Sequence, residues 1–156
     1  MRIRFSVSSA AIALTVVLFL VAASGESVEK CVPTKPDMLG PFYKPGAPER
    51  SSVGKGYVLS GVVKSSADCH HIKEARIEIW LAGPEGEYAD NYRATIISDQ
   101  AGAYHFESNF PPSYSGRPPH IHIKVSAEGF RTLVTQHYPA ESHTSGIFDL
   151  VLMPQK

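Results

Sequence analysis

Residues 76–81 read Arg-Ile-Glu-Ile-Trp-Leu, and this alternation indicates the fold class. Successive side chains on a β-strand point to opposite faces, so Ile77, Ile79 and Leu81 share one face. Six further stretches show strand-like patterning between turn-forming residues, at 57–63, 93–98, 103–107, 120–125, 132–138 and 148–152. No stretch has a helical repeat of apolar residues. The sequence therefore predicts an all-β chain, a single antiparallel β-sandwich of about seven strands.

The first 25 residues differ from the rest in composition. Met1–Arg4 is basic, residues 10–23 are almost wholly apolar, and small residues precede the first acid, Glu26. This is the layout of a secretory signal peptide, with cleavage after Ala23 or Gly25. The alternative is a retained membrane anchor, but the apolar run is short for a transmembrane helix. We therefore expect residues 1–25 to be removed and the protein to be secreted or periplasmic.

Residues 26–55 are expected to form an extended arm in front of a sandwich core at residues 56–156. Five prolines between residues 33 and 48 exclude a long helix there. The two cysteines, Cys31 and Cys69, lie in the part predicted to be exported. An even count in an oxidising compartment favours one disulfide between arm and core, and two buried free thiols are the alternative.

The charge balance argues against two classes of partner. The chain has 15 basic and 15 acidic residues, and loss of Arg2 and Arg4 with the signal peptide leaves a net charge near −2. There is no basic patch of the kind that nucleic acid requires. There is also no basic amphipathic helix for a membrane surface. We therefore expect that the protein does not bind nucleic acid and, after removal of the signal peptide, does not associate with a membrane.

Residues 112–122 read Pro-Ser-Tyr-Ser-Gly-Arg-Pro-Pro-His-Ile-His and carry the clearest sign of chemistry. On a strand, His120 and His122 point the same way and can offer two nitrogens to one metal ion. Imidazole suits zinc, copper, iron or nickel, and a tyrosine oxygen beside it favours a harder ion such as ferric iron. Asp, Glu and Cys are absent nearby, which argues against common zinc sites and a two-His-one-carboxylate iron site. By itself, a His-x-His pair is more often a hydrogen-bonded or solvent-facing pair.

Two loops, 82–88 and 110–117, each bring a tyrosine next to a predicted strand. The best four-ligand set is therefore Tyr88, Tyr114, His120 and His122. Tyr92, four residues after Tyr88, is a spare candidate for the ligand assigned to Tyr88. A copper or zinc site would instead combine the histidine pair with other histidines of the chain, namely His105, His137 or His143.

The chain from about residue 39 to 152 resembles the intradiol ring-cleavage dioxygenases, which include catechol, hydroxyquinol and protocatechuate dioxygenases. Six motifs in order carry the resemblance. They are Gly40-Pro41-Phe42-Tyr43, Ala75-Arg76-Ile77-Glu78-Ile79-Trp80, Gly86-Glu87-Tyr88, Tyr114, Arg117-Pro118-Pro119-His120-Ile121-His122 and Thr135-Gln136-His137-Tyr138. Each motif is weak alone, but their order and spacing together make a specific signal.

The resemblance implies an enzyme with a non-haem Fe(III) centre and a role in the catabolism of aromatic compounds. The activity expected is insertion of both atoms of O2 into a catechol-type aromatic diol, giving a cis,cis-muconate-type diacid. The implied metal ligands are Tyr88, Tyr114, His120 and His122. The implied catalytic residues are Arg117, Tyr114 and Gln136, and the implied substrate-binding residues are Pro41, Tyr43, Arg117 and Gln136.

The departures from the family pattern leave three points open. The sequence shows no counterpart of the long helical segment by which catechol dioxygenases dimerise, so a homo-oligomer is possible but its mode of association is open. No extra cationic residue is evident to hold a substrate carboxylate, which favours a neutral catechol. A secreted binding module of transthyretin-like or carbohydrate-binding type would share the strand pattern, because fold does not fix function.

Overall fold

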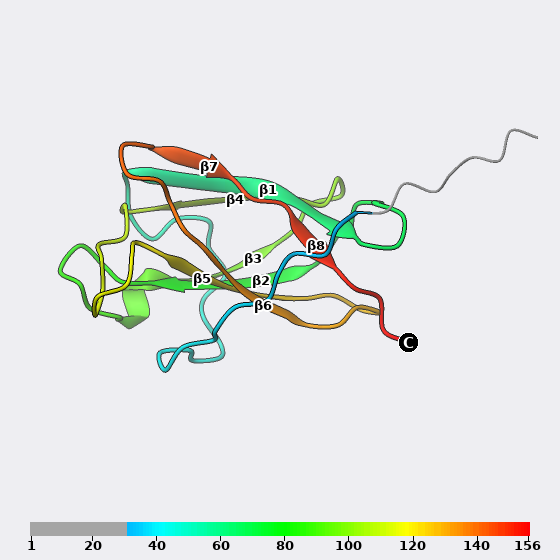
Figure 1. The fold of residues 1–156 in the computed structure, drawn as a ribbon, viewed down its shortest axis with the longest axis horizontal. Helices are drawn as coiled ribbons and strands as arrows, with labels where there is room; N and C mark the ends of the chain where they lie inside the picture. Colours follow the sequence, from blue (N-terminus) through cyan, green and yellow to red (C-terminus); the bar gives the residue numbers. More distant parts are fainter. Residues whose placement is uncertain (1–30) are drawn as a thin grey trace, which may run out of the picture.

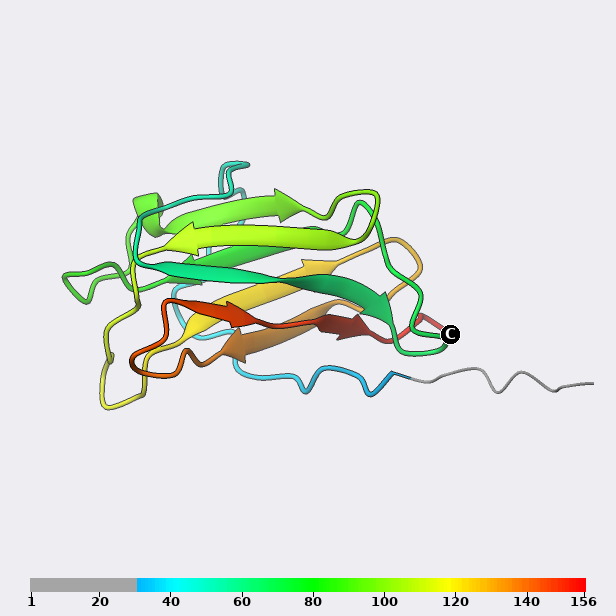
Figure 2. The same ribbon diagram turned by 90° about the horizontal axis from the view of Figure 1, so that it is seen from above.

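The computed structural model describes residues 31–156. The predicted signal peptide and the first residues of the arm lie outside this range. Two four-stranded sheets pack face to face as a β-sandwich, which confirms the predicted fold class (Figures 1 and 2). The strands are β1 Tyr57–Ser65, β2 Arg76–Leu81, β3 Arg93–Ile97, β4 Ala103–Ser108, β5 Ile121–Ser126, β6 Leu133–His137, β7 Ser145–Ile147 and β8 Leu150–Leu152. One short 3-10 helix, Asp90–Tyr92, precedes β3.

The strand count and one set of pairings differ from the sequence prediction. The sheet β3-β2-β5-β6 is antiparallel throughout, but in the other sheet β7 and β8 both pair parallel to β1. The last strand, expected at residues 148–152, corresponds to the shorter β8. β7 is an additional short strand that was not predicted, and a break in the ladder separates it from β8. Across this break Val62 N–H donates to the Asp149 carboxylate at 2.9 Å. With three residues of mixed polarity, β7 has too little pattern to be recognised in the sequence.

The core lies between the two sheets. Alternate residues of β2 and β5 point into it, and Ile77, Ile79, Ile121 and Ile123 are almost fully buried. Large side chains from β1 and β4, such as Phe106, face them from the other sheet. Burial of such side chains contributes roughly 1.5–3 kcal/mol each, so the alternation seen in the sequence fixes which face of each strand turns inward.

The arm covers the outer face of the sheet β3-β2-β5-β6. In Figure 1 its blue start runs beside β8 and passes the β6 edge, and its cyan part then lies on the side of this sheet that faces away from the other sheet. Backbone hydrogen bonds hold it at both edges, from Asp37 N–H to the Val134 carbonyl at 2.9 Å and from Thr95 N–H to the Pro48 carbonyl at 2.8 Å. Both faces of the sheet are therefore buried, and the outer one is lined by polar as well as apolar groups.

The predicted disulfide is present, joining Cys31 of the arm to Cys69 beyond β1, with the Cα atoms 5.2 Å apart. It fixes the start of the arm to the sandwich. Among residues 31–156 no helix has the length and apolar character needed to cross a membrane.

Candidate metal centre

The two histidines lie on the outer face of the sheet, beneath the arm. His120 comes directly before β5 and His122 is its second residue, and their exposed fractions are only 3% and 2%. His122 has a neighbour on each side in the strand ladder. These neighbours are Trp80 on β2 and Gln136 on β6. The Trp80 ring stacks on the His122 imidazole, with centroids 4.9 Å apart and planes 7° apart. The strand register thus holds the His122 ring in one orientation.

Tyr88 brings a phenol oxygen to both histidines. Its hydroxyl lies 3.1 Å from His120 Nε2 and 3.2 Å from His122 Nε2. His120 Nδ1 lies 2.8 Å from the Pro118 carbonyl. Because a carbonyl can only accept, the His120 proton sits on Nδ1, and Nε2 keeps its lone pair toward Tyr88. Three donor atoms therefore converge from a loop and a strand that are far apart in sequence.

Burial sets the protonation of these groups. It lowers the pKa of His122 to about 4, with a further contribution from His120, and it lowers the pKa of His120. Both imidazoles are therefore neutral near pH 7, which is the form that binds metals. Burial also raises the pKa of Tyr88 to about 12. This phenol needs a nearby cation to ionise at neutral pH.

Tyr114 and Arg117 are held together by a tight turn. Their backbones exchange two hydrogen bonds, of 3.2 and 2.9 Å, around Ser115 and Gly116. Both central residues have positive φ, 50° and 76°, as in a type I′ turn. The Tyr114 ring stands edge-on to the Tyr88 ring, with centroids 5.3 Å apart. The turn places both predicted functional side chains at one cavity.

This cavity has a volume of about 380 Å³ and contains all four predicted metal ligands. Its lining residues are Met38, Gly40, Pro41, Phe42, Tyr88, Tyr114, Ser115, Arg117, His120 and His122. The arm supplies one wall and the turn at residues 114–117 another. Predicted metal-binding, catalytic and substrate-binding residues are therefore brought together, with two exceptions.

Tyr43 and Gln136 do not line this cavity. The Tyr43 hydroxyl accepts a hydrogen bond from Lys124 Nζ at 2.7 Å and lies 3.2–3.3 Å from the Glu78 carboxylate. It follows Phe42 on the extended arm and lies over a neighbouring polar pair of the sheet. Gln136 stands behind Arg117, whose Nη2 donates to its Oε1 at 2.7 Å. Gln136 is therefore separated from the cavity by Arg117 and by Met38, whose carbonyl accepts from the Gln136 amide nitrogen at 2.6 Å.

The sequence did not point to the aromatic packing around the centre. Phe42 stacks on the Tyr88 ring with centroids 4.3 Å apart, and Trp80 stacks on His122. Phe42 lies in a recognised motif, but its partner depends on how the arm crosses the sheet. Trp80 stands opposite His122, so knowledge of the β2–β5 register alone would have found it.

The alternative ligands lie elsewhere. His137 is on the opposite face of β6, and its Nε2 is 2.7 Å from the Tyr57 hydroxyl. His105 and His143 are exposed, and the Tyr92 hydroxyl donates to Glu85 rather than into the cavity. Within residues 31–156 no three His, Cys, Asp or Glu side chains are grouped for metal binding. Two imidazole nitrogens with phenol oxygens and no carboxylate are a donor set that fits iron, and the oxygens favour the ferric state.

The curated proteins that the chain is similar to include several 1,2-dioxygenases. No protein-family model matches the chain. It is 28% identical over 139 residues to chlorocatechol 1,2-dioxygenase of Pseudomonas sp. strain P51, covering 67% of this chain and 55% of the relative. It is 30% identical over 140 residues to hydroxyquinol 1,2-dioxygenase of Rhodococcus opacus, covering 69% and 46%. The chain spans about half the length of the curated relatives it matches.

Solved structures share the architecture. The dioxygenase domain of a dioxygenase carbohydrate-binding protein fusion from Streptomyces sp. SirexAA-E superposes with a TM-score of 0.69 at 27% identity, covering 80% of this chain and all of that one. An intradiol ring-cleavage dioxygenase from Tetranychus urticae superposes with a TM-score of 0.73, covering 81% and 97%. At 19% identity, the second match shows the common fold.

Proposed function

We propose that the chain, which belongs to the intradiol ring-cleavage dioxygenase family, cleaves a catechol-type aromatic diol with O2 at a non-haem Fe(III) centre. The bond between the two hydroxylated carbons breaks, and both oxygen atoms of O2 enter the product, a cis,cis-muconate-type diacid. The observation that carries this proposal is the approach of His120 Nε2 and His122 Nε2 to the Tyr88 hydroxyl, at 3.1 and 3.2 Å.

In this proposal His120, His122, Tyr88 and Tyr114 hold the iron. Bound ferric iron would keep the tyrosines ionised at neutral pH and act as the Lewis acid for both catechol oxygens. The high pKa of Tyr88 in the metal-free protein makes iron binding release a proton from this phenol. Iron uptake should therefore weaken as the pH falls.

The remaining roles fall to side chains that line or support the cavity. Tyr114 Oη accepts a proton from the diol as the general base. The Arg117 guanidinium stabilises negative charge that develops on the substrate ring. Pro41 and Phe42 of the arm, with the Tyr88 ring, make an apolar wall against which a flat aromatic ring can lie.

The lining of the cavity favours a neutral diol as the substrate. Arg117 is the one Lys, Arg, Asp or Glu side chain among the residues that line it. Two of the Arg117 hydrogen bonds already go to Gln136 and Tyr138. A substrate carboxylate would find no second cationic side chain here, so its desolvation would be poorly compensated.

Export and chain organisation are part of the same proposal. Residues 1–25 act as a cleaved signal peptide that sends the protein to the periplasm or the outside of the cell. Residues 26–55 then form the arm and residues 56–156 the catalytic sandwich. Mass spectrometry of the protein exported by its host tests this, and a mature chain that retains residues 1–25 would contradict it.

Ring cleavage is tested with the exported protein loaded with ferric iron. Catechol, a carboxylated catechol and hydroxyquinol are supplied as substrates, and O2 uptake is measured with the mass of the product. One O2 consumed per ring, with 18O2 giving a diacid that carries two labels, supports the proposal. Iron-loaded protein that consumes no O2 with any diol would leave a β-sandwich binding module as the better interpretation.

A further inference from the structure

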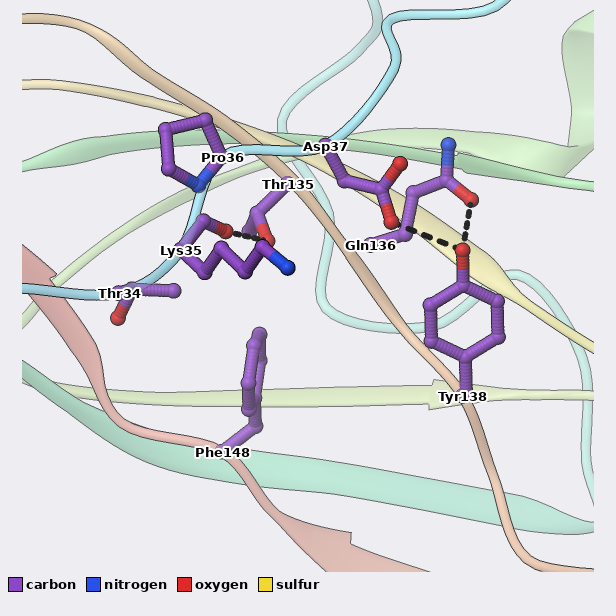
Figure 3. Close-up of a pocket in the computed structure, with 8 residues that line it drawn as sticks. All are labelled: Thr34, Lys35, Pro36, Asp37, Thr135, Gln136, Tyr138 and Phe148. Atoms are coloured by element: carbon purple, nitrogen blue, oxygen red, sulfur yellow. Dashed lines mark hydrogen bonds between the residues drawn. The ribbon is translucent and has the colours of Figure 1, made fainter.

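Three side chains form a polar wall behind Arg117. Asp37 comes from the arm, while Gln136 and Tyr138 come from β6 and the residue after it. Figure 3 shows the Tyr138 hydroxyl between the Asp37 carboxylate and the Gln136 amide oxygen, at 2.8 and 3.0 Å. One side of this wall lines a second cavity of about 430 Å³. On its other side Arg117 lines the candidate metal centre.

The donors and acceptors of the wall can be assigned. Arg117 Nη2 carries two protons, which it donates to Gln136 Oε1 at 2.7 Å and to the Tyr138 oxygen at 2.9 Å. Tyr138 has one proton, and the Asp37 carboxylate is both its closer and its charged acceptor. The chain of hydrogen bonds therefore runs in one direction, from Arg117 through Tyr138 to Asp37.

Two members of the wall, Asp37 and Gln136, also hydrogen-bond to the backbone of the arm at Met38. Met38 N–H donates to the second oxygen of the Asp37 carboxylate at 2.6 Å. The Gln136 amide nitrogen donates to the Met38 carbonyl at 2.6 Å, which directs its oxygen toward Arg117. The arm segment that walls the cavity thus also sets where the guanidinium of Arg117 is held.

We propose that Tyr138 and Asp37 are positioning residues for Arg117, a role that rests on the function proposed above for this arginine. Through the Tyr138 hydroxyl, Asp37 orients the guanidinium and partly balances its charge. An arginine has five N–H donors, and two are used by the wall, which leaves the others for the substrate side. Tyr138 itself is 43% exposed and lines only the second cavity, so it acts through Arg117 rather than by touching substrate.

The test compares Tyr138→Phe, Asp37→Asn and the double variant with Tyr92→Phe as control. The control also removes one phenol hydroxyl, but from a surface hydrogen bond to Glu85. We expect kcat for catechol to fall roughly ten- to hundredfold in each single variant, the usual effect of losing a hydrogen bond to a charged group. The double variant should fall no further than the worse single variant, because both act along one chain.

A second readout does not depend on iron or turnover. In 15N-labelled metal-free protein, a held Arg117 gives separate Nη–H signals, assigned through their loss in Arg117→Lys. These signals should merge in Tyr138→Phe and Asp37→Asn and persist in Tyr92→Phe. Unchanged kcat or unchanged Arg117 signals in both single variants would overturn the proposal, as would additive losses. A wild-type protein without ring cleavage would instead refute the proposed function, since the Arg117 signals report positioning separately.

Discussion

Replacement of Gly40 by alanine should disturb the candidate metal centre through one methyl group. Gly40 has φ +73°, and a Cβ there would lie 2.9 Å from His122 Cε1. A left-handed conformation costs an alanine about 1–2 kcal/mol. Ordinary carbon contacts are about 3.5–4.0 Å, so the imidazole, stacked on Trp80, must also shift, and such overpacking costs typically about 1–3 kcal/mol. We expect a total loss of about 2–5 kcal/mol in the free energy of unfolding.

Gly46→Ala is the matched control for this prediction. Gly46 lies on the same arm with φ +76°, and no atom lies within 4 Å of its added Cβ. It should show the backbone cost alone and keep its iron. Urea unfolding of metal-free protein gives the two free energies, and metal analysis gives the iron content after reconstitution. Equal free energies and equal iron content in the two variants would refute the packing of the arm on His122.

Three further outcomes are expected. Tyr88→Phe should lose most bound iron, and most of the tyrosinate absorption band with it, whereas Tyr92→Phe should keep both; full iron content in Tyr88→Phe would contradict the ligand assignment. Burial lowers the pKa of His137 below its ordinary value, so the stability it contributes is present above about pH 6.5 and lost as the pH falls. Urea titrations from pH 7 to 5 should show a smaller loss for His137→Gln than for the wild type. Cys31→Ser opens a loop spanning 38 residues and should cost about 4 kcal/mol by the chain-entropy model; an unchanged urea midpoint would argue against the disulfide.

The sequence was sufficient for features that depend on local pattern. Alternation at residues 76–81 and 120–125 predicted both strands and the inward face of each, because burial selects every second residue. The pairing of Cys31 with Cys69 also followed from composition, since only two cysteines exist. The parallel pairing of β7 could not be predicted, because three residues carry no period.

Features that depend on the path of the arm were beyond the sequence. Tyr43 and Pro41 belong to one motif, yet Pro41 lines the cavity while Tyr43 turns to Glu78 and Lys124. Local pattern does not show which side of an extended, proline-rich segment meets the sheet. Asp37 illustrates the same limit, because its contact with Tyr138 joins residues 101 positions apart.

We have proposed that two histidines and two tyrosines hold a ferric ion that binds a diol. The most direct test records the visible spectrum and metal content of the purified protein, before and after anaerobic addition of catechol. We expect about one iron per chain and a tyrosinate-to-iron absorption band that moves to longer wavelength with catechol. A colourless protein that cannot be reconstituted with iron would contradict it.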